Sequence, residues 1–383
     1  MKAFRYVAKG APLQGAELAD PVAGPGWVVV DVEAAGLCHS DVHVIDGMIE
    51  PIVRPPFTLG HEVAGTVAAL GEGVEGYAIG DRVAVAIIAH PEVKASYAPG
   101  IGLDGGYAER LVAHASTLVP LPDNVSTVHA AVATDSVVTA YHAVRTEAQA
   151  KPGDVIAVVG LGGLGLNGVR TGVIAGATVY GVDINPDTFE AARAAGAREC
   201  FTDVTALADL RPDAIIDFAG VGSTTSDAID AVRRLGRVVV VGLGTKTTTF
   251  SNGSLIRKSV ELRGSYGASK DEYRQVLGFI AEGRITPIVE EIPFADLNEG
   301  LDRLRHGKAR AAWSPARGPD PSWHHAVSGA SPSERTASVV KEVRDPRPFP
   351  WPGRVHSSVT IANEVVTIRT PMAADITACV VRP

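Results

Sequence analysis

The chain has 383 residues, 46% of them hydrophobic and 20% charged, which is enough for two globular domains. Its net charge of −8 argues against nucleic acid or an anionic membrane as the main partner. No stretch reaches the ~18 consecutive apolar residues of a membrane span, and the N-terminal residues lack the apolar core of a signal peptide. The three cysteines are far apart and odd in number, which is no disulfide framework, so we expect a reducing, cytoplasmic compartment.

Residues 1–140 are rich in Val, Ala and Gly and contain short alternating stretches. Strands are predicted at Trp27–Glu33, Glu62–Leu70 and Asp81–Ile88, between turns that contain glycine and proline. This part of the chain is therefore predicted to be a mostly β domain.

From Lys151 the pattern changes to short apolar runs that alternate with helical stretches. The predicted strands are Asp154–Gly160, Thr178–Asp183, Ala214–Phe218 and Arg237–Gly242. The predicted helices are Leu164–Ala175, Thr188–Ala195, Ser226–Arg234, Tyr273–Ala281 and Leu297–Arg305. Alternation of strand and helix at this spacing predicts an α/β fold with a parallel, doubly wound sheet.

A glycine-rich turn between the first of these strands and its helix indicates a dinucleotide site. The motif consists of Gly160, Gly162, Gly163, Leu164 and Gly165. Its glycines allow a tight turn, a close approach of the backbone to a pyrophosphate, and packing of the helix on the sheet. Asp183 ends the next strand, where a carboxylate accepts hydrogen bonds from the adenosine ribose and repels a 2′-phosphate, so NAD is favoured over NADP. The alternative is a glycine-rich turn without a ligand.

Cys38, His61 and Asp135 are the candidate metal ligands. Thiolate and imidazole are ligands that zinc prefers, and a catalytic zinc needs three protein ligands and one open position. Asp135 lies in an otherwise apolar segment, an unusual place for a charge that is neither paired nor metal-bound. The alternatives are a buried structural thiol for Cys38, a core histidine for His61, and for Asp135 an N-cap of a helix beginning at Ser136.

Neighbouring polar residues add to this candidate site. Glu62 is expected as a transient ligand or as support for a ligand, and Asp41 as the acceptor for the second ring nitrogen of His61. The hydroxyl of Ser40 and the ring of His43 are expected to carry a proton away from whatever binds there.

Together these motifs resemble the zinc-dependent alcohol dehydrogenases of the medium-chain dehydrogenase/reductase superfamily. The matching segments are Gly36–His43, Leu59–Glu62, Gly80–Val83, Gly105–Glu109, Asp135–Tyr141, and Gly160–Gly165 with Asp183. The resemblance implies a GroES-like catalytic domain over residues 1–142, with a returning segment at 266–312, and a Rossmann NAD-binding domain over 143–265. It covers roughly residues 1–310.

The resemblance also implies roles for individual residues. Cys38, His61 and Asp135 would hold zinc, Ser40 would link the substrate oxygen to the nicotinamide ribose, and His43 would exchange the proton with solvent. The residues implied to contact the cofactor are His39 and Arg310 at the pyrophosphate, and Thr139, Leu164 and Val241 around the nicotinamide.

Two segments depart from the family pattern. Many relatives hold a structural zinc with four closely spaced cysteines, but there is none between Asp81 and Gly105, so we predict one catalytic zinc per chain and no structural zinc. Relatives usually finish with a short strand after a glycine-containing turn, whereas here Gly307 leads into a proline-rich region. We expect residues 313–383 to be an extension of unclear role, with strands possible in Val359–Thr370.

The resulting hypothesis is an NAD- and zinc-dependent enzyme that interconverts a primary or secondary alcohol and its aldehyde or ketone. A homodimer or homotetramer is expected, with no nucleic acid or membrane partner. Two alternatives are a zinc-free enoyl or quinone reductase of the same superfamily, and a non-catalytic, nucleotide-binding redox sensor.

Overall fold

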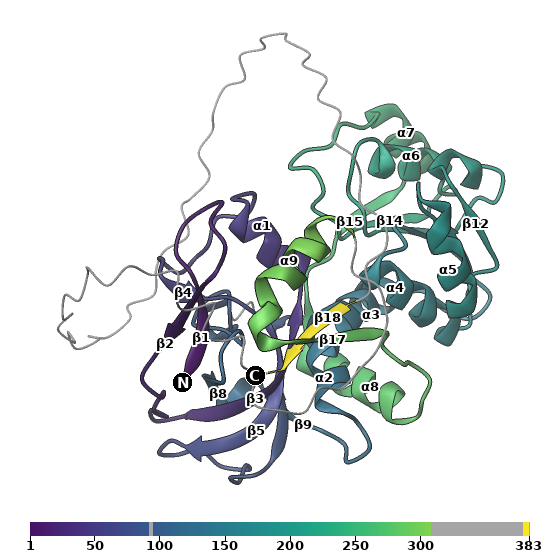
Figure 1. Ribbon diagram of the computed structural model, residues 1–383. Coiled ribbons are helices and arrows are strands. Elements are labelled where there is room, and N and C mark those ends of the chain that lie inside the picture. The colour runs from purple at the N-terminus through teal and green to yellow at the C-terminus, as the bar shows by residue number, and fades with distance from the viewer. Residues whose placement is uncertain (92–94, 308–377, 383) are drawn as a thin grey trace.

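The computed structural model describes residues 1–91, 95–307 and 378–382, which form a mostly β domain and a parallel α/β domain (Figure 1). The strands expected within Val359–Thr370 lie outside the described residues. None of the helices in the described part of the chain is both long and apolar enough to cross a membrane.

The α/β domain confirms the predicted parallel sheet. Its strand order is β12-β11-β10-β13-β14-β15, and each neighbouring pair is parallel. The strands are β10 (Val155–Val159), β11 (Thr178–Val182), β12 (Glu199–Phe201), β13 (Ala214–Asp217), β14 (Arg237–Val240) and β15 (Glu261–Gly264). The helices are α4 (Gly163–Ile174), α5 (Phe189–Ala195), α6 (Thr224–Ala231) and α7 (Asn252–Lys258). Ile156 and Val158 pack in a core with α4 and α5, and Ala157 and Val159 in a core with α6, so β10 is buried on both faces.

The other domain is mostly β, as predicted. Its larger sheet has the order β17-β18-β3-β5-β6-β9, with β8 also paired to β3. The strands are β3 (Trp27–Leu37), β5 (Glu62–Leu70), β6 (Arg82–Val85), β8 (Arg110–His114), β9 (Leu118–Pro120), β17 (Val289–Pro293) and β18 (Ala378–Arg382). Smaller sheets join β1 (Lys2–Tyr6) to β2 (Gln14–Glu17) and β4 (Phe57–Thr58), and β7 (Ile88–His90) to β16 (Ala268–Ser269). Its helices include α1 (His39–Ile45), α8 (Lys270–Ala281) and α9 (Leu297–Arg305).

One long helical stretch leads from the β domain to the α/β domain. Ser126 caps its start by accepting a hydrogen bond from the backbone N–H of His129. Helix α2 (Thr127–Val132) runs into a π-helical turn over Ala133–Val137, then α3 (Val138–Tyr141) and a second π-helical turn over His142–Glu147. Such widened turns are rare and occur often at functional sites.

Strand β18 differs from the sequence prediction. Residues 378–382 were expected to belong to an extension, but they lie inside the larger sheet between β17 and β3. In Figure 1 this strand, in yellow, crosses the centre of the β domain. The pairing partners are far away in the sequence, so the local pattern did not reveal the strand.

Candidate metal centre and cofactor turn

Four side chains with metal-binding atoms meet at one point in the β domain. The ligand atoms of Cys38, His61, Glu62 and Asp135 all lie within 4.8 Å of one another. Cys38 follows β3 directly, His61 and Glu62 stand at the start of β5, and Asp135 belongs to the π-helical turn after α2. Because β3 and β5 pair with each other and α2 packs against both, the fold brings together residues that are distant in sequence.

The donor atoms face a common centre. Asp135 Oδ2 lies 3.3 Å from His61 Nε2 and 3.6 Å from Cys38 Sγ. The hydroxyl of Ser40 lies 3.6 Å from the same sulfur atom. The structure therefore groups the three predicted ligands and places Ser40 beside them.

Hydrogen bonds behind the donors fix their orientation. Asp41 Oδ1 lies 3.3 Å from His61 Nδ1, the predicted contact, which leaves Nε2 directed at the centre. Tyr107 donates its hydroxyl to the other oxygen of Asp41 at 2.7 Å. Thr139 donates to Asp135 Oδ1 at 2.6 Å, so Oδ2 stays available.

The electrostatics of the cluster suit a divalent cation. Burial raises the pKa of Cys38 to about 11, and burial together with the charge of Asp135 raises the pKa of Glu62 well above its usual range. Burial would lower the pKa of His61, but the charge of Asp41 keeps it well above the usual value. Glu62 Oε2 is buried without a hydrogen-bond partner. A cation inverts these preferences, because it favours thiolate and carboxylate and gives the orphaned oxygen a partner. The residues thus fit a zinc ion.

The structure contradicts the helix-cap alternative for Asp135. The helical stretch begins at Thr127 with Ser126 as its cap, so Asp135 lies within the stretch and not at its start. Burial would raise the pKa of Asp135, but the hydrogen bond and the charge of His61 lower it. Asp135 is thus an ionised carboxylate that contacts His61 and Thr139.

The glycine-rich turn has the backbone shape expected for phosphate binding. Gly160 has a φ of +85°, and a Cβ on Gly165 would lie 1.7 Å from the carbonyl oxygen of Gly160. Helix α4 begins at Gly163, so its free N–H groups lie beside the turn. Asp183 accepts hydrogen bonds from the backbone N–H groups of Leu161, at 2.7 Å, and Asn185, at 2.9 Å, which holds its carboxylate against the turn.

The remaining predicted residues occupy several elements. His39, Ser40 and His43 all lie on α1, while Leu164 lies in the first turn of α4 and Val241 just after β14. Burial and the charge of His43 lower the pKa of His39 to about 4, so His39 is neutral at pH 7. Arg310 lies outside the described residues.

Two supporting roles were missed by the sequence analysis. Tyr107 was noted only as part of the matching segment Gly105–Glu109, yet its side chain is fully buried and braces Asp41. Thr139 was expected beside the nicotinamide, and the structure adds a hydrogen bond to Asp135. A buried tyrosine hydroxyl needs a partner, but nothing in the sequence identifies that partner.

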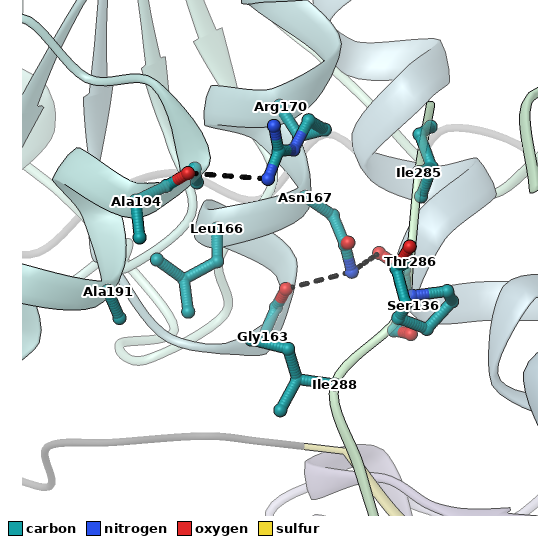
Figure 2. A pocket seen from close by; sticks show the side chains of 12 residues that line it. Ser136, Gly163, Leu166, Asn167, Arg170, Ala191, Ala194, Ile285, Thr286 and Ile288 are labelled. Atoms are coloured by element: carbon teal, nitrogen blue, oxygen red, sulfur yellow. Dashed lines mark hydrogen bonds between the residues drawn. The ribbon is translucent and has the colours of Figure 1, made fainter. Parts of the chain in front are cut away.

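A pocket of about 130 Å³ lies between α4, α5 and the segment Ile285–Ile288 (Figure 2). None of the four metal-binding side chains lines it. The side-chain N–H₂ of Asn167 on α4 donates to the carbonyl of Ser136, at 3.3 Å, and to that of Gly163, at 3.0 Å. This side chain thus ties the cofactor-domain helix to the turn that carries Asp135.

Comparisons with known proteins identify the family. Two family models match, the alcohol dehydrogenase GroES-like domain over residues 24–123 and the zinc-binding dehydrogenase domain over residues 163–282. An NAD-dependent alcohol dehydrogenase of Sulfurisphaera tokodaii is 32% identical over 345 residues, which cover 81% of this chain and 98% of the relative. The chain belongs to the zinc-dependent alcohol dehydrogenases of the medium-chain superfamily.

Solved structures of this family agree with the assignment. An acetophenone reductase from Geotrichum candidum in complex with NAD has 31% sequence identity and a TM-score of 0.74, over 80% of this chain and 94% of that chain. A 2R,3R-butanediol dehydrogenase from Bacillus subtilis has 28% identity and a TM-score of 0.73, over 81% and 97%. The protein is therefore an NAD-dependent alcohol dehydrogenase with zinc and NAD as cofactors. The comparisons favour this activity over the two alternatives, the zinc-free reductase and the redox sensor.

Proposed function

We propose that Cys38, His61 and Asp135 hold one catalytic zinc ion per chain, with Glu62 as an additional, transient ligand. The observation that carries this proposal is the convergence of four donor atoms that all lie within 4.8 Å of one another. The family relationship supports zinc as the metal, and one thiolate, one imidazole and one carboxylate leave a position for substrate.

Bound at this site, zinc supplies a Lewis acid that lowers the pKa of an alcohol toward neutrality. Ser40 Oγ, which lies beside the donors, would accept the proton of the substrate hydroxyl and release its own proton along the relay toward His43. His43 lies one helical turn further along α1, and burial lowers the pKa of its ring. It is neutral at pH 7 and takes up the proton before releasing it to solvent.

The glycine-rich turn and Asp183 bind the cofactor in this proposal. The N-terminus of α4, with His39 as a further donor, would bind the pyrophosphate, and Asp183 would accept from the adenosine ribose. Thr139, Leu164 and Val241 would pack around the nicotinamide and orient it toward the substrate. Asp183 repels a 2′-phosphate, which supports NAD as the coenzyme.

The substrate is proposed to be an apolar secondary alcohol or the corresponding ketone. The segments proposed to line its site, Ile45–Phe57, Ala89–Leu103 and Tyr266–Lys270, mix apolar and small residues without a cluster of like charges. By their names, two structural relatives act on a ketone and on a diol with secondary hydroxyls, which supports this class. The cytoplasm is proposed as the compartment, in keeping with a thiolate ligand.

We expect a homodimer that forms through strand β15. Within the described residues β15 is an outer strand of its sheet and pairs with β14 alone. Leu262 on this strand is 37% exposed and Ile256 on the adjoining helix α7 is 72% exposed. An open edge beside exposed apolar side chains favours pairing with a second copy. Light scattering on wild type and on Leu262→Arg tests this, and a monomeric wild type would contradict it.

The central test combines metal analysis with NADH formation on a panel of alcohols. Wild type is expected to contain about one zinc per chain, and Cys38→Ala to lose both metal and turnover. Cys200→Ala is the matched control, because Cys200 is a buried thiol in the α/β domain, remote from the cluster. Zinc-free active protein, or undiminished turnover in the Cys38 variant, would refute the proposal.

A further inference from the structure

Strand β18 contacts the part of the sheet that presents the metal ligands. It pairs in parallel with β17 and antiparallel with β3, where Val380 lies opposite Gly36 and Val381 opposite Ala35. The same short section of β3 leads directly into Cys38. The C-terminal strand thus fixes the backbone one to three residues before the proposed thiolate ligand.

A single row of paired residues connects β18 to the second ligand-bearing strand. Gly36 pairs with Val380 on one side and with Glu62, the neighbour of His61, on the other. A Cβ on Gly36 would lie 1.9 Å from Glu62 Oε2, so the glutamate side chain lies directly over the β3 backbone. A shift of β3 at this row therefore moves Cys38 relative to the ligands on β5.

Helix α2 extends this connection to the third ligand. It packs across β18, β3 and β5, and it runs without interruption into the turn that contains Asp135. The side chain of Val380 is fully buried and belongs to the core cluster that includes Val132 and Ala133. Val380 therefore belongs to the core that packs against the start of the turn containing Asp135.

We infer that β18, and Val380 in particular, positions the three metal ligands, so that the last residues of the chain determine how tightly the site retains its metal. This inference rests on the proposed zinc site. Val380 does not touch the metal. It acts through the backbone of β3 and through α2, and in a close-packed interior small displacements are transmitted to the ligands.

The test compares Val380→Ala with Val238→Ala. Both valines are fully buried in interior strands, but Val238 lies on β14 in the parallel sheet, remote from the ligands. Both variants are expected to lose similar unfolding stability. V380A is expected to release zinc to a chelator at least tenfold faster than wild type, with a changed thiolate absorption band in the cobalt-substituted protein. V238A is expected to match wild type in both measurements.

The outcomes separate the inference from the proposed function. If wild type binds neither zinc nor cobalt, the proposed zinc site fails. If wild type holds its metal and V380A releases it no faster than V238A does, the site stands and the role of β18 is refuted. Should V380A not fold, Val380→Thr, which keeps the branched shape, replaces it with the same expected order of release rates.

Discussion

The hydroxyl of Tyr107 is a sensitive point for testing how the metal ligands are oriented. Tyr107→Phe removes one oxygen atom and leaves the ring in place, so no cavity forms around the aromatic core. The hydroxyl donates to Asp41 Oδ2 at 2.7 Å and lies 3.2 Å from the carbonyl of Gly36. Burial, followed by the charge of Asp41, raises the pKa of Tyr107 well above its usual range, so it remains a donor at any working pH.

The expected loss of stability follows from the charge on the acceptor. Asp41 is 1% exposed, and its Oδ1 also accepts from the backbone N–H of Gly60 and contacts His61. Hydrogen bonds to charged groups contribute about 1.5–3 kcal/mol to stability. Removing the donor while the charged acceptor stays buried costs an amount in the upper part of that range. We therefore expect Tyr107→Phe to lower the free energy of unfolding by about 2–3 kcal/mol. Because Asp41 orients His61, metal affinity should fall by about 10- to 100-fold.

Tyr273→Phe is the matched control. Tyr273 is also fully buried, but its hydroxyl donates to a neutral acceptor, the carbonyl of Ala130, at 2.8 Å. Its loss should cost about 1 kcal/mol and leave metal affinity unchanged. Urea unfolding of the metal-free variants measures the first quantity, and competition with a chelator measures the second. If Tyr107→Phe and Tyr273→Phe lose the same amount of stability, and Tyr107→Phe keeps the metal affinity of wild type, the reasoning is refuted.

Three further predictions concern other parts of the molecule. Burial would raise the pKa of Glu272, but hydrogen bonds from His142 and Thr146 lower it to about 2. The ionised carboxylate therefore stabilises the fold above about pH 4.5, and this contribution is lost as the pH falls toward 2. After solvent screening is taken into account, the contribution to the free energy of unfolding is about 2 kcal/mol. Glu272→Gln should therefore weaken the fall in the free energy of unfolding with pH between about 4.5 and 2, and an unchanged pH dependence would contradict this. Asn167→Ala removes the two hydrogen bonds that the Asn167 side chain donates in Figure 2, and it should raise the KM for NAD about 3- to 10-fold with zinc content unchanged. Asp183→Ala should reduce the NAD-to-NADP preference in kcat/KM at least tenfold, and an unaltered ratio would remove Asp183 from the ribose site.

The parallel sheet was predictable because its strands carry a local signature. A strand buried on both faces, such as Val155–Val159, is a short apolar run between turn residues, and this pattern does not depend on what covers it. The predicted ends of the helices were less accurate where a side-chain cap decides where the helix begins. Helix α8 begins at Lys270, three residues before the predicted start, because Ser269 and Glu272 form a reciprocal cap.

The candidate site was only partly predictable. Cys38 and His61 indicate a metal through their residue types, which are a property of the sequence alone. Asp135 stood out as a carboxylate among apolar residues, but its position inside a π-helical turn, and the hydrogen bond from Thr139, depend on how the helix meets the sheet. The role of Tyr107 depends in the same way on the packing of Asp41.

By itself, the sequence determined the residue types of the site, the glycine-rich turn and the alternation of strands and helices. Each of these depends only on the residues themselves and on those next to them in the chain. Only the tertiary structure decided that residues 378–382 complete the sheet beside Cys38. Strand pairing joins backbones that are remote in sequence, and its energy comes from partners and a core that exist only after folding. For that reason the end of the chain, expected to be an extension, becomes part of the catalytic domain.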